Sequence, residues 1–270
     1  ASSALYESLH ARIDALKSKQ ITPGLAAILV GENPASQIYI RNKTKKFDSL
    51  GLKSEIHRLE EGVSEEELLR LINQINNDDT FHGILVQLPL PNHIDSQKII
   101  HAISPTKDVD GFHPENAGLL SIGTPRFVPC TPKGIMYILE HFNIKLHGQH
   151  VVVVGRSNIV GRPVSVLSSL KSLGNATVTI CHSGTSDLKQ FTTQGDIVVA
   201  AMGSPEFLDA SFIKEGACLV DVGINRVERD GKSTIVGDIN QASVMGKASA
   251  LTPVPKGIGP MTIAMLVENT

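Results

Sequence analysis

The chain has 270 residues, of which 41% are hydrophobic and 19% are charged, with a formal net charge of −2. This charge gives no electrostatic case for nucleic-acid binding, and no apolar run approaches the ~20 residues needed to cross a bilayer. The three cysteines, Cys130, Cys181 and Cys218, are scattered and lack metal-ligand spacing, so we expect reduced thiols and no metal site. The chain starts at Ala1 without a signal-like segment, which is typical of a cytoplasmic protein or of the processed form of an organellar one.

The first part of the chain alternates between helix and strand patterns. Apolar residues at helical spacing predict a helix over residues 3–18, and helical composition predicts another over 35–50. Ser64 and Glu67 form a capping box that starts a third helix. Apolar runs bounded by turn residues predict strands at 25–30, 52–59 and 83–88. This order of elements favours a parallel sheet.

Residues 104–130 show no alternation of helix and strand patterns and are rich in turn-forming residues, so we expect a long irregular segment. Such segments inside compact domains are often functional. Thr131 and Pro132 then make an N-cap and N1 pair, which predicts a helix running to about Phe142.

The second half resumes the alternation around the segment HVVVVGRSNIVGRP, residues 150–163. Four consecutive valines predict a strand buried on both faces. The strands are expected at 150–154, 176–181, 196–201, 217–222 and 248–251, and the helices at 160–172, 186–194 and 209–215. An apolar C-terminal helix has no face left to cover there, so we expect it to pack on the first domain.

The sequence therefore predicts a two-domain α/β protein. Residues 1–130, completed by 253–270, would form an N-terminal α/β catalytic domain. Residues 131–252 would form a Rossmann-like dinucleotide-binding domain, with a cleft between the two.

A candidate dinucleotide site follows the valine strand. Gly155 and Gly161 lie in a strand–turn–helix connection, where free N–H groups and the helix dipole favour an anion. The full Gly-x-Gly-x-x-Gly fingerprint is absent, so an ordinary connection is the alternative. The second strand ends without a carboxylate, and the turn carries Arg156 and Ser157, which favours NADP over NAD. A solvated turn arginine is the alternative for Arg156.

Candidate chemistry also lies in the first domain. Tyr39 and Lys43 are four residues apart on a predicted helix, so they face the same space. A lysine that loses part of its solvation becomes a usable proton acceptor. The alternative is that Lys43 belongs to a solvated basic helix without a catalytic role. Gln87 ends a predicted buried strand, where a structural hydrogen bond and a ligand contact are equally plausible. Asp108 and Asp110 are candidates either for turn caps or for substrate binding.

Several of these pieces together resemble one family. The motifs are YIRNK (39–43), GILVQLPLP (83–91), KDVDGFH (107–113), PCTPKG (129–134), GRSNIVGRP (155–163), DVGIN (221–225) and TPVPKGIGPMT (252–262). In this order, and over almost the whole chain, they resemble the bifunctional methylenetetrahydrofolate dehydrogenase/methenyltetrahydrofolate cyclohydrolase family.

The resemblance implies an NADP-dependent enzyme of one-carbon metabolism and purine biosynthesis. It would oxidise 5,10-methylenetetrahydrofolate to the methenyl form and hydrolyse that to 10-formyltetrahydrofolate, as a homodimer in the cytoplasm. The implied catalytic residues are Lys43, Tyr39, Gln87 and Asp110. The implied folate-binding residues also include Val86, Leu88, Pro255, Gly257, Gly259, Pro260 and Thr262. The implied cofactor-binding residues are Gly155, Arg156, Ser157, Val160, Gly161, His182, Ser183 and Ile224.

Lys256 departs from the family pattern, which usually has glycine at this position. If that position needs a positive φ, a lysine there is strained; if not, it would meet the acidic glutamate tail of the folate. Two other functions remain open from the residues alone. One is a shikimate-dehydrogenase-like NADP oxidoreductase, and the other is a dinucleotide-binding module without catalysis.

Overall fold

In the computed structural model, which describes residues 1–229 and 231–270, the chain divides into two compact units. The first unit comprises Ser2–Cys130 and Ile263–Thr270, and the second comprises Thr131–Thr262 with Ala1. The expected return to the first domain at residue 253 thus falls at residue 263, and the loop before it groups with the second unit. Across the described ranges, no helix combines the length and the apolarity that a bilayer span requires.

The first unit is built on a three-stranded parallel sheet in the order β2-β1-β3. Its strands are β1 (Gly24–Val30), β2 (Lys53–Leu59) and β3 (Gly83–Val86). The central strand β1 has the sequence GLAAILV, and all seven of its residues are buried. An uninterrupted apolar run is what a strand covered on both faces requires, so the expected parallel arrangement is confirmed.

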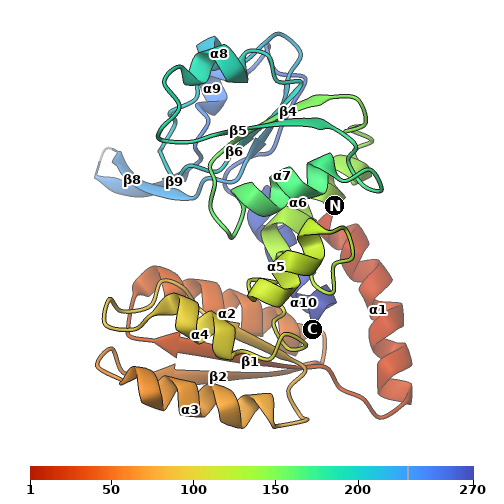
Figure 1. Cartoon of the computed structure of the whole chain (residues 1–270), viewed down its shortest axis with the longest axis vertical. Coiled ribbons are helices and arrows are strands. Elements are labelled where there is room, and N and C mark those ends of the chain that lie inside the picture. The colour runs from red at the N-terminus through yellow and green to blue at the C-terminus, as the bar shows by residue number, and fades with distance from the viewer. Residues whose placement is uncertain (230) are drawn as a thin grey trace. The chain divides into compact units, whose positions relative to one another are not determined.

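Helices surround this sheet, as Figure 1 shows for α2, α3 and α4. The helices of the first unit are α1 (Ser2–Ser18), α2 (Pro34–Ser49), α3 (Glu65–Asn76), α4 (Ser96–Ala102) and α5 (Pro114–Ser121), with the end of α10 (Ile258–Asn269). Helix α3 begins where predicted, because the Ser64 hydroxyl accepts the N–H of Glu67 at 3.2 Å. Leu68 and Ile72 of α3 and Ile99 of α4 share one buried cluster with β1 and β3.

The second unit contains a five-stranded parallel sheet in the order β10-β7-β6-β4-β5. Its strands are β4 (His150–Val154), β5 (Thr177–Cys181), β6 (Ile197–Ala200), β7 (Cys218–Asp221) and β10 (Ala250–Leu251). The valine strand lies inside this sheet between β6 and β5, and Val151–Val154 are 0–3% exposed. Burial of each valine side chain contributes about 1.5–3 kcal/mol to the stability of the fold. The strand therefore gives the turn that follows it a fixed position.

The helices of the second unit are mostly short. They are α6 (Cys130–His141, from Thr131 on), α7 (Gly161–Ser169), α8 (Leu188–Thr192), the 3₁₀ helix η1 (Ala210–Phe212), α9 (Gln241–Val244) and the start of α10. The helix expected at 209–215 is wrong, because the structure has only the 3₁₀ turn there, capped by Asp209. The irregular segment expected at 104–130 is wrong in part, because α5 lies inside it with His113 as its N-cap and Pro114 at N1.

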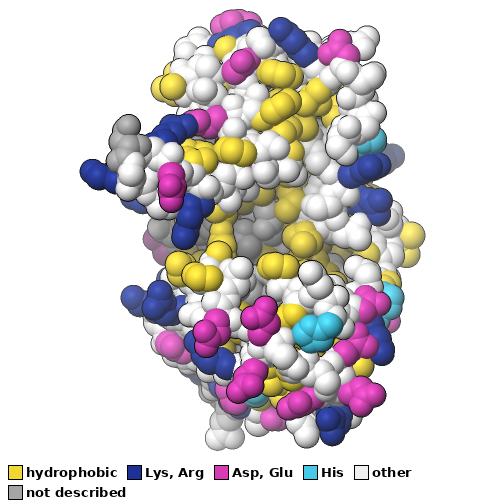
Figure 2. Space-filling model, turned by 90° about the vertical axis from the view of Figure 1, so that its left-hand side faces the viewer, with side chains coloured by type: hydrophobic (Ala, Val, Ile, Leu, Met, Phe, Trp, Pro, Cys, Tyr) yellow, Lys and Arg dark blue, Asp and Glu magenta, His cyan; other side chains and the backbone are white. Residues whose placement is uncertain are grey.

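A two-stranded antiparallel hairpin also lies in the second unit and was not expected. It pairs β8 (Asn225–Arg229) with β9 (Lys232–Val236). Figure 2 shows it as a projection with several Lys and Arg side chains around it. Arg229 of β8 forms an ion pair with Glu206. Both strands are short and largely exposed, so their sequences show little of the apolar periodicity that predicts a strand.

Candidate active site

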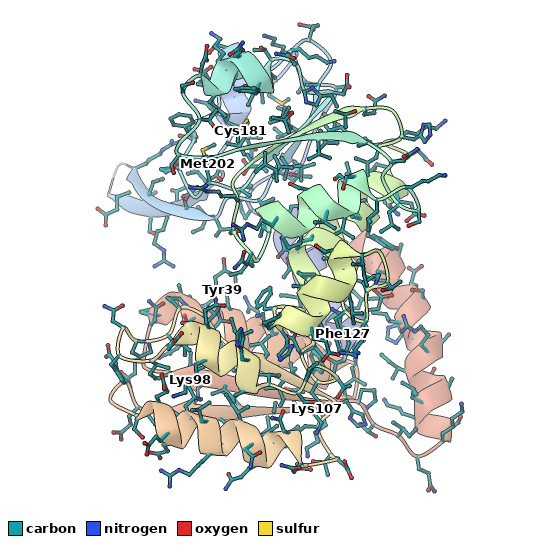
Figure 3. All side chains as sticks on the ribbon, viewed as in Figure 1. Tyr39, Lys98, Lys107, Phe127, Cys181 and Met202 are labelled. Atoms are coloured by element: carbon teal, nitrogen blue, oxygen red, sulfur yellow. The ribbon has the colours of Figure 1, made fainter. Side chains whose placement is uncertain are left out.

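Helix α2 positions the first pair of candidate residues. Asn33 caps the helix by accepting the N–H groups of Ala35 and Ser36, and Pro34 starts the first turn. Tyr39 is 38% exposed and Lys43 is half-buried. Figure 3 shows Tyr39 on α2, directed away from the sheet of its unit. Burial of its ring raises the pKa of the Tyr39 phenol, so the hydroxyl is neutral at physiological pH.

Gln87 meets Lys43 from the neighbouring sheet. It directly follows β3, and its backbone N–H donates to Ile28 O at 2.9 Å, which continues the sheet by one residue. Its side-chain Nε2 donates to Leu88 O at 2.7 Å, so its Oε1 is turned toward Lys43. Lys43 Nζ donates to that oxygen at 3.5 Å, a long hydrogen bond that leaves the amine free to serve another partner.

Asp110 is the third group at this place. An isolated parallel bridge between Ile84 and Asp108 carries the chain alongside β3 and then presents the half-buried Asp110. Burial raises the pKa of the Asp110 carboxyl; the positive charge of Lys43 opposes this rise, whereas the negative charge of Asp108 adds to it. Cys130 Sγ lies 3.8 Å from Asp110 Oδ1 and contributes a weak stabilising hydrogen bond to the ionised form.

Asp108 caps a turn, which is the first of the two roles, turn cap or substrate binding, that the sequence allowed for it. It is 2% exposed, and its carboxylate accepts the N–H groups of Phe112 at 3.2 Å and His113 at 2.8 Å. The amide of Asn116 donates to the same carboxylate at 2.8 Å, and Arg126 in turn donates to Asn116 Oδ1 at 3.1 Å. Asp108 therefore caps the turn that presents Asp110, and the neighbouring acid is left to face Lys43.

The other predicted folate residues fall into two groups. Val86 ends β3 and Leu88 follows that strand in the first unit, whereas the other predicted residues lie in the second unit. Pro255 and Gly257 lie in the loop before α10, and Gly259, Pro260 and Thr262 lie at the start of α10 itself. Within the second unit, Thr262 Oγ1 lies 2.9 Å from Thr131 Oγ1, and a Cβ on Gly257 would lie 2.4 Å from Pro253 O.

Lys256 has a φ of +82°, a conformation that favours glycine. The strained alternative of the sequence prediction is therefore confirmed. A left-handed conformation costs an ordinary L-residue roughly 1–2 kcal/mol.

The candidate dinucleotide turn lies at the carboxyl edge of the second sheet. Gly155 has a φ of +131°, and a Cβ there would lie 2.2 Å from Ala201 O. A Cβ on Gly161 would lie 2.1 Å from Gly155 O. Both positions thus admit only glycine, and the turn from β4 into α7 is as tight as a phosphate-binding turn requires.

Polar groups surround this turn. Ser157 Oγ accepts the N–H groups of Val160 at 3.1 Å and Gly161 at 3.4 Å, and its hydroxyl hydrogen can still be donated to an anion. Arg156 and Ser157 are both exposed. A cradle of glycines with exposed Arg and Ser donors fits a phosphorylated dinucleotide. Among the described residues, no group of three or more His, Cys, Asp or Glu side chains is arranged to hold a metal ion.

The ends of the neighbouring strands supply the remaining predicted cofactor residues. After β5, His182 Nδ1 accepts the N–H of Gly184 at 3.0 Å, which leaves Ser183 exposed between them. After β7, Ile224 is 51% exposed. Because β5, β4, β6 and β7 are adjacent and parallel, their carboxyl ends share one edge of the sheet. Figure 3 shows Cys181 and Met202 at this edge, and both belong to one packed cluster.

Sequence reasoning missed two buried acids near this edge, Asp221 and Asp238, which are 1% and 0% exposed. Burial raises the pKa of Asp221 to about 6, against three backbone hydrogen bonds that lower it. The available signal was a glycine within two residues of each acid, in DVGIN and in VGDIN. A glycine next to a buried acid marks a close approach of backbone to carboxylate.

Comparisons with known proteins agree with this geometry. Residues 1–110 match the family model for the tetrahydrofolate dehydrogenase/cyclohydrolase catalytic domain, and residues 129–270 match that for the NAD(P)-binding domain of the same family. The Bifunctional protein FolD of Magnetococcus marinus is 54% identical, with 98% of this chain and 91% of that protein covered. The protein of the same name from Moorella thermoacetica is also 54% identical, over 96% of this chain and 90% of that protein.

Solved structures give the same result. The FolD methylenetetrahydrofolate dehydrogenase/cyclohydrolase of Campylobacter jejuni has a TM-score of 0.93 at 49% identity, covering 99% of this chain and 93% of that one. The Trypanosoma brucei dehydrogenase–cyclohydrolase, solved with NADP and an inhibitor, has a TM-score of 0.93 at 36% identity, covering 99% and 92%. A shikimate dehydrogenase of Aquifex aeolicus shares only the fold, with a TM-score of 0.55 at 13% identity over 92% of this chain and 91% of that one.

Proposed function

This chain belongs to the tetrahydrofolate dehydrogenase/cyclohydrolase family, and from that premise we propose which of its residues carry out the two reactions. The enzyme oxidises 5,10-methylenetetrahydrofolate to 5,10-methenyltetrahydrofolate with NADP and hydrolyses the product to 10-formyltetrahydrofolate. The observation that supports our assignment is the convergence of Lys43, Gln87 and Asp110 at one place in the first unit.

In the proposed assignment the folate lies against these residues. The ionised carboxylate of Asp110 accepts two parallel N–H groups from the amino edge of the pterin, which a carboxylate is shaped to do. The ring of Tyr39 packs on the folate aromatic system, with Val86 and Leu88 beside it. Gln87 keeps Lys43 directed toward the reacting carbon through its Oε1, since its Nε2 is fixed on Leu88 O.

The oxidation step needs positioning more than it needs a base. The carbon that loses hydride is flanked by two nitrogens, whose lone pairs stabilise the cation that forms. NADP, when bound, supplies the acceptor for that hydride. Asp110 fixes the pterin so that the reacting carbon keeps its position during this step.

The hydrolysis step uses Lys43 directly. Water attacks the carbon that has become cationic, and the Lys43 amine accepts a proton from this water as the new C–O bond forms. The later opening of the ring breaks one of the two C–N bonds, and the lysine can return its proton to the departing nitrogen. The same amine thus serves both reactions at one carbon.

We assign the cofactor to the second unit. The turn between Gly155 and Gly161 and the start of α7 receive the pyrophosphate, because the helix dipole favours an anion there. Val160 shapes this turn through the hydrogen bond from its N–H to Ser157 Oγ. Arg156, Ser157 and Ser183 recognise the 2′-phosphate, for which the fork of an arginine is well suited. His182 holds the Ser183 turn through Gly184, and the exposed Ile224 offers an apolar contact to the nicotinamide side.

We further propose a cytoplasmic homodimer that supplies one-carbon units for purine biosynthesis. Family membership supports this proposal. Light scattering at micromolar concentration tests the dimer, since a mass of one chain, 29.0 kDa, would contradict it.

The test of the site is Lys43→Met, with cyclohydrolase activity and NADP binding both measured. Loss of a general base should lower cyclohydrolase turnover by roughly 10²–10⁴-fold and leave the NADP dissociation constant unchanged. Lys45→Met is the matched control, because Lys45 is an exposed lysine on the same helix. Cyclohydrolase activity that survives Lys43→Met would refute the assignment. Shikimate serves as the control substrate and should give no NADP reduction.

A further inference from the structure

Two aspartates are buried at the carboxyl edge of the second sheet, and the proposed reactions do not use them. Asp221 ends β7 and is 1% exposed, and Asp238 follows β9 and is 0% exposed. A buried carboxylate is costly unless hydrogen bonds replace its water. The partners of these two acids therefore indicate what the acids are for.

Asp238 binds two separate segments of the edge. Its Oδ2 accepts the N–H groups of Met202 at 2.7 Å and Gly203 at 2.9 Å. Its Oδ1 accepts the N–H of Ser204 at 2.9 Å. The same Oδ1 accepts the side-chain amide of Asn225 at 2.8 Å. One carboxylate thus joins the loop after β6 to the loop after β7 through four hydrogen bonds, two on each oxygen.

Asp221 holds Asp238 in place. Its Oδ1 accepts the N–H groups of Gly223 and Asp238, both at 2.9 Å, and its Oδ2 accepts that of Ile239 at 2.9 Å. The backbones approach closely to allow this. A Cβ on Gly237 would lie 1.9 Å from Asp221 Oδ2, and one on Gly223 would lie 2.4 Å from the backbone N of Asp238.

One joined segment lies against the Gly155 turn, and the other carries Ile224, a residue of the proposed cofactor site. The loop after β6 begins at Ala201, whose N–H donates to Val154 O at 2.8 Å and whose carbonyl oxygen lies against Gly155. In Figure 3, Met202 marks this loop at the edge of the sheet. The loop after β7 contains Ile224, placed between two residues that the acids bind, Gly223 and Asn225.

We propose that Asp238, held by Asp221, is a positioning residue for NADP binding, because it fixes the loop after β6, which lies against Gly155, to the loop after β7, which carries Ile224. This inference rests on the proposed cofactor site. Asp238 touches no cofactor atom in this account and acts through the backbone of residues 202–204 and through Asn225. A residue with only a structural role would lower both activities together as the folded fraction falls.

The bifunctional enzyme provides an internal control for this distinction, since cyclohydrolysis consumes no NADP. Asp238→Asn keeps the shape but turns an NH₂ group toward backbone N–H donors. We expect the KM for NADP to rise about tenfold or more, with cyclohydrolase turnover within twofold of the wild type. Asp196→Asn is the matched control. Asp196 also accepts a backbone N–H, from His150 at 2.7 Å, but at the amino edge of the same sheet. Its KM for NADP should not change.

A milder variant covers the case in which Asp238→Asn does not fold. Asn225→Ala removes one of the four hydrogen bonds and should raise the KM for NADP about threefold with cyclohydrolysis intact. An unchanged KM in the folded variants, or an equal fall in both activities, would overturn the inference. Arg156→Ala is run in parallel. If it leaves NADP affinity unchanged, the proposed 2′-phosphate site fails, whereas the result for Asp238 still stands by itself.

Discussion

Gly161→Ala should uncouple NADP binding from cyclohydrolysis. Gly161 is the first residue of α7, and a Cβ there would lie 2.1 Å from Gly155 O and 2.9 Å from Arg156 N. An unstrained contact of a carbon atom needs roughly 3.5 Å, so the turn must move by on the order of 1 Å. Both clashing atoms are backbone atoms, and no side-chain rotation can relieve the contact.

The magnitude follows from two opposing effects. Alanine in a helix is favoured over glycine by up to about 1 kcal/mol, whereas forcing a group into a packed site costs about 1–3 kcal/mol. We therefore expect Gly161→Ala to be destabilising by about 1–2 kcal/mol. A displacement of ~1 Å in a binding turn can cost on the order of 10²-fold in the function that the turn serves. NADP affinity should fall by about that factor.

Calorimetric titration with NADP, a cyclohydrolase assay and a thermal melt together test this prediction. Cyclohydrolase turnover should stay within twofold of the wild type at a temperature below the melt. Gly118→Ala in α5 is the control, because a Cβ there meets no atom within 4 Å. It should stabilise the protein by about 1 kcal/mol without affecting NADP affinity. A wild-type NADP affinity in Gly161→Ala would contradict the proposed role of this turn in binding NADP.

Two of the acids and Lys256 also have effects that can be measured. Burial and Asp108 raise the pKa of Asp110, so folate binding should weaken as the pH falls. Asp108→Asn should move this loss of binding to lower pH, which fluorescence titrations with folate over a pH series would measure. A loss of binding at the same pH in both proteins would contradict the assignment of Asp110. The raised pKa of Asp221, about 6 against 3.8, means that its protonated form favours the fold. This contribution to stability is present below pH 3.8 and is lost as the pH rises through 6. In denaturant unfolding, the stability of the wild type relative to Asp221→Asn should therefore fall by on the order of 3 kcal/mol between pH 4 and 7. An equal difference in stability at both pH values would contradict this expectation. Lys256→Gly should relieve the strain at φ +82° and raise stability by up to about 1 kcal/mol, whereas Lys256→Ala should not. If the lysine also binds the glutamate tail, both variants should weaken polyglutamylated folate more than monoglutamate, and equal losses for the two substrates would exclude that role.

The sheets were predictable because their signals are local. Four valines in a row at β4 and the run GLAAILV at β1 are compatible with few structures other than strands buried on both faces. The spacing of Tyr39 and Lys43 likewise follows from helix geometry alone. The hairpin of β8 and β9 had a local signal too, because Gly231 lies between two short runs of residues and glycine is typical of hairpin turns. The hairpin was not predicted because the residues on both sides of this glycine are mostly polar and do not show the pattern of a strand.

The convergence of the site was beyond local reasoning. Asp108 and Asp110 are chemically identical and two residues apart, and only burial decides that the first caps a turn and the second faces Lys43. Asp221 and Asp238 are separated by the hairpin, so their contact depends on how β7 and the chain after β9 come together. Only the family resemblance, which covers almost the whole chain, linked Lys43, Gln87 and Asp110 before the structure did.

The central claim is that the Lys43 amine lies over the reacting carbon of the folate. A crystal structure of the enzyme with a bound folate analogue measures this directly. We expect Lys43 Nζ to lie within about 3.5 Å of a water or atom at that carbon, with Asp110 on the amino edge of the pterin. A pterin bound elsewhere, with Lys43 Nζ directed into solvent, would contradict it.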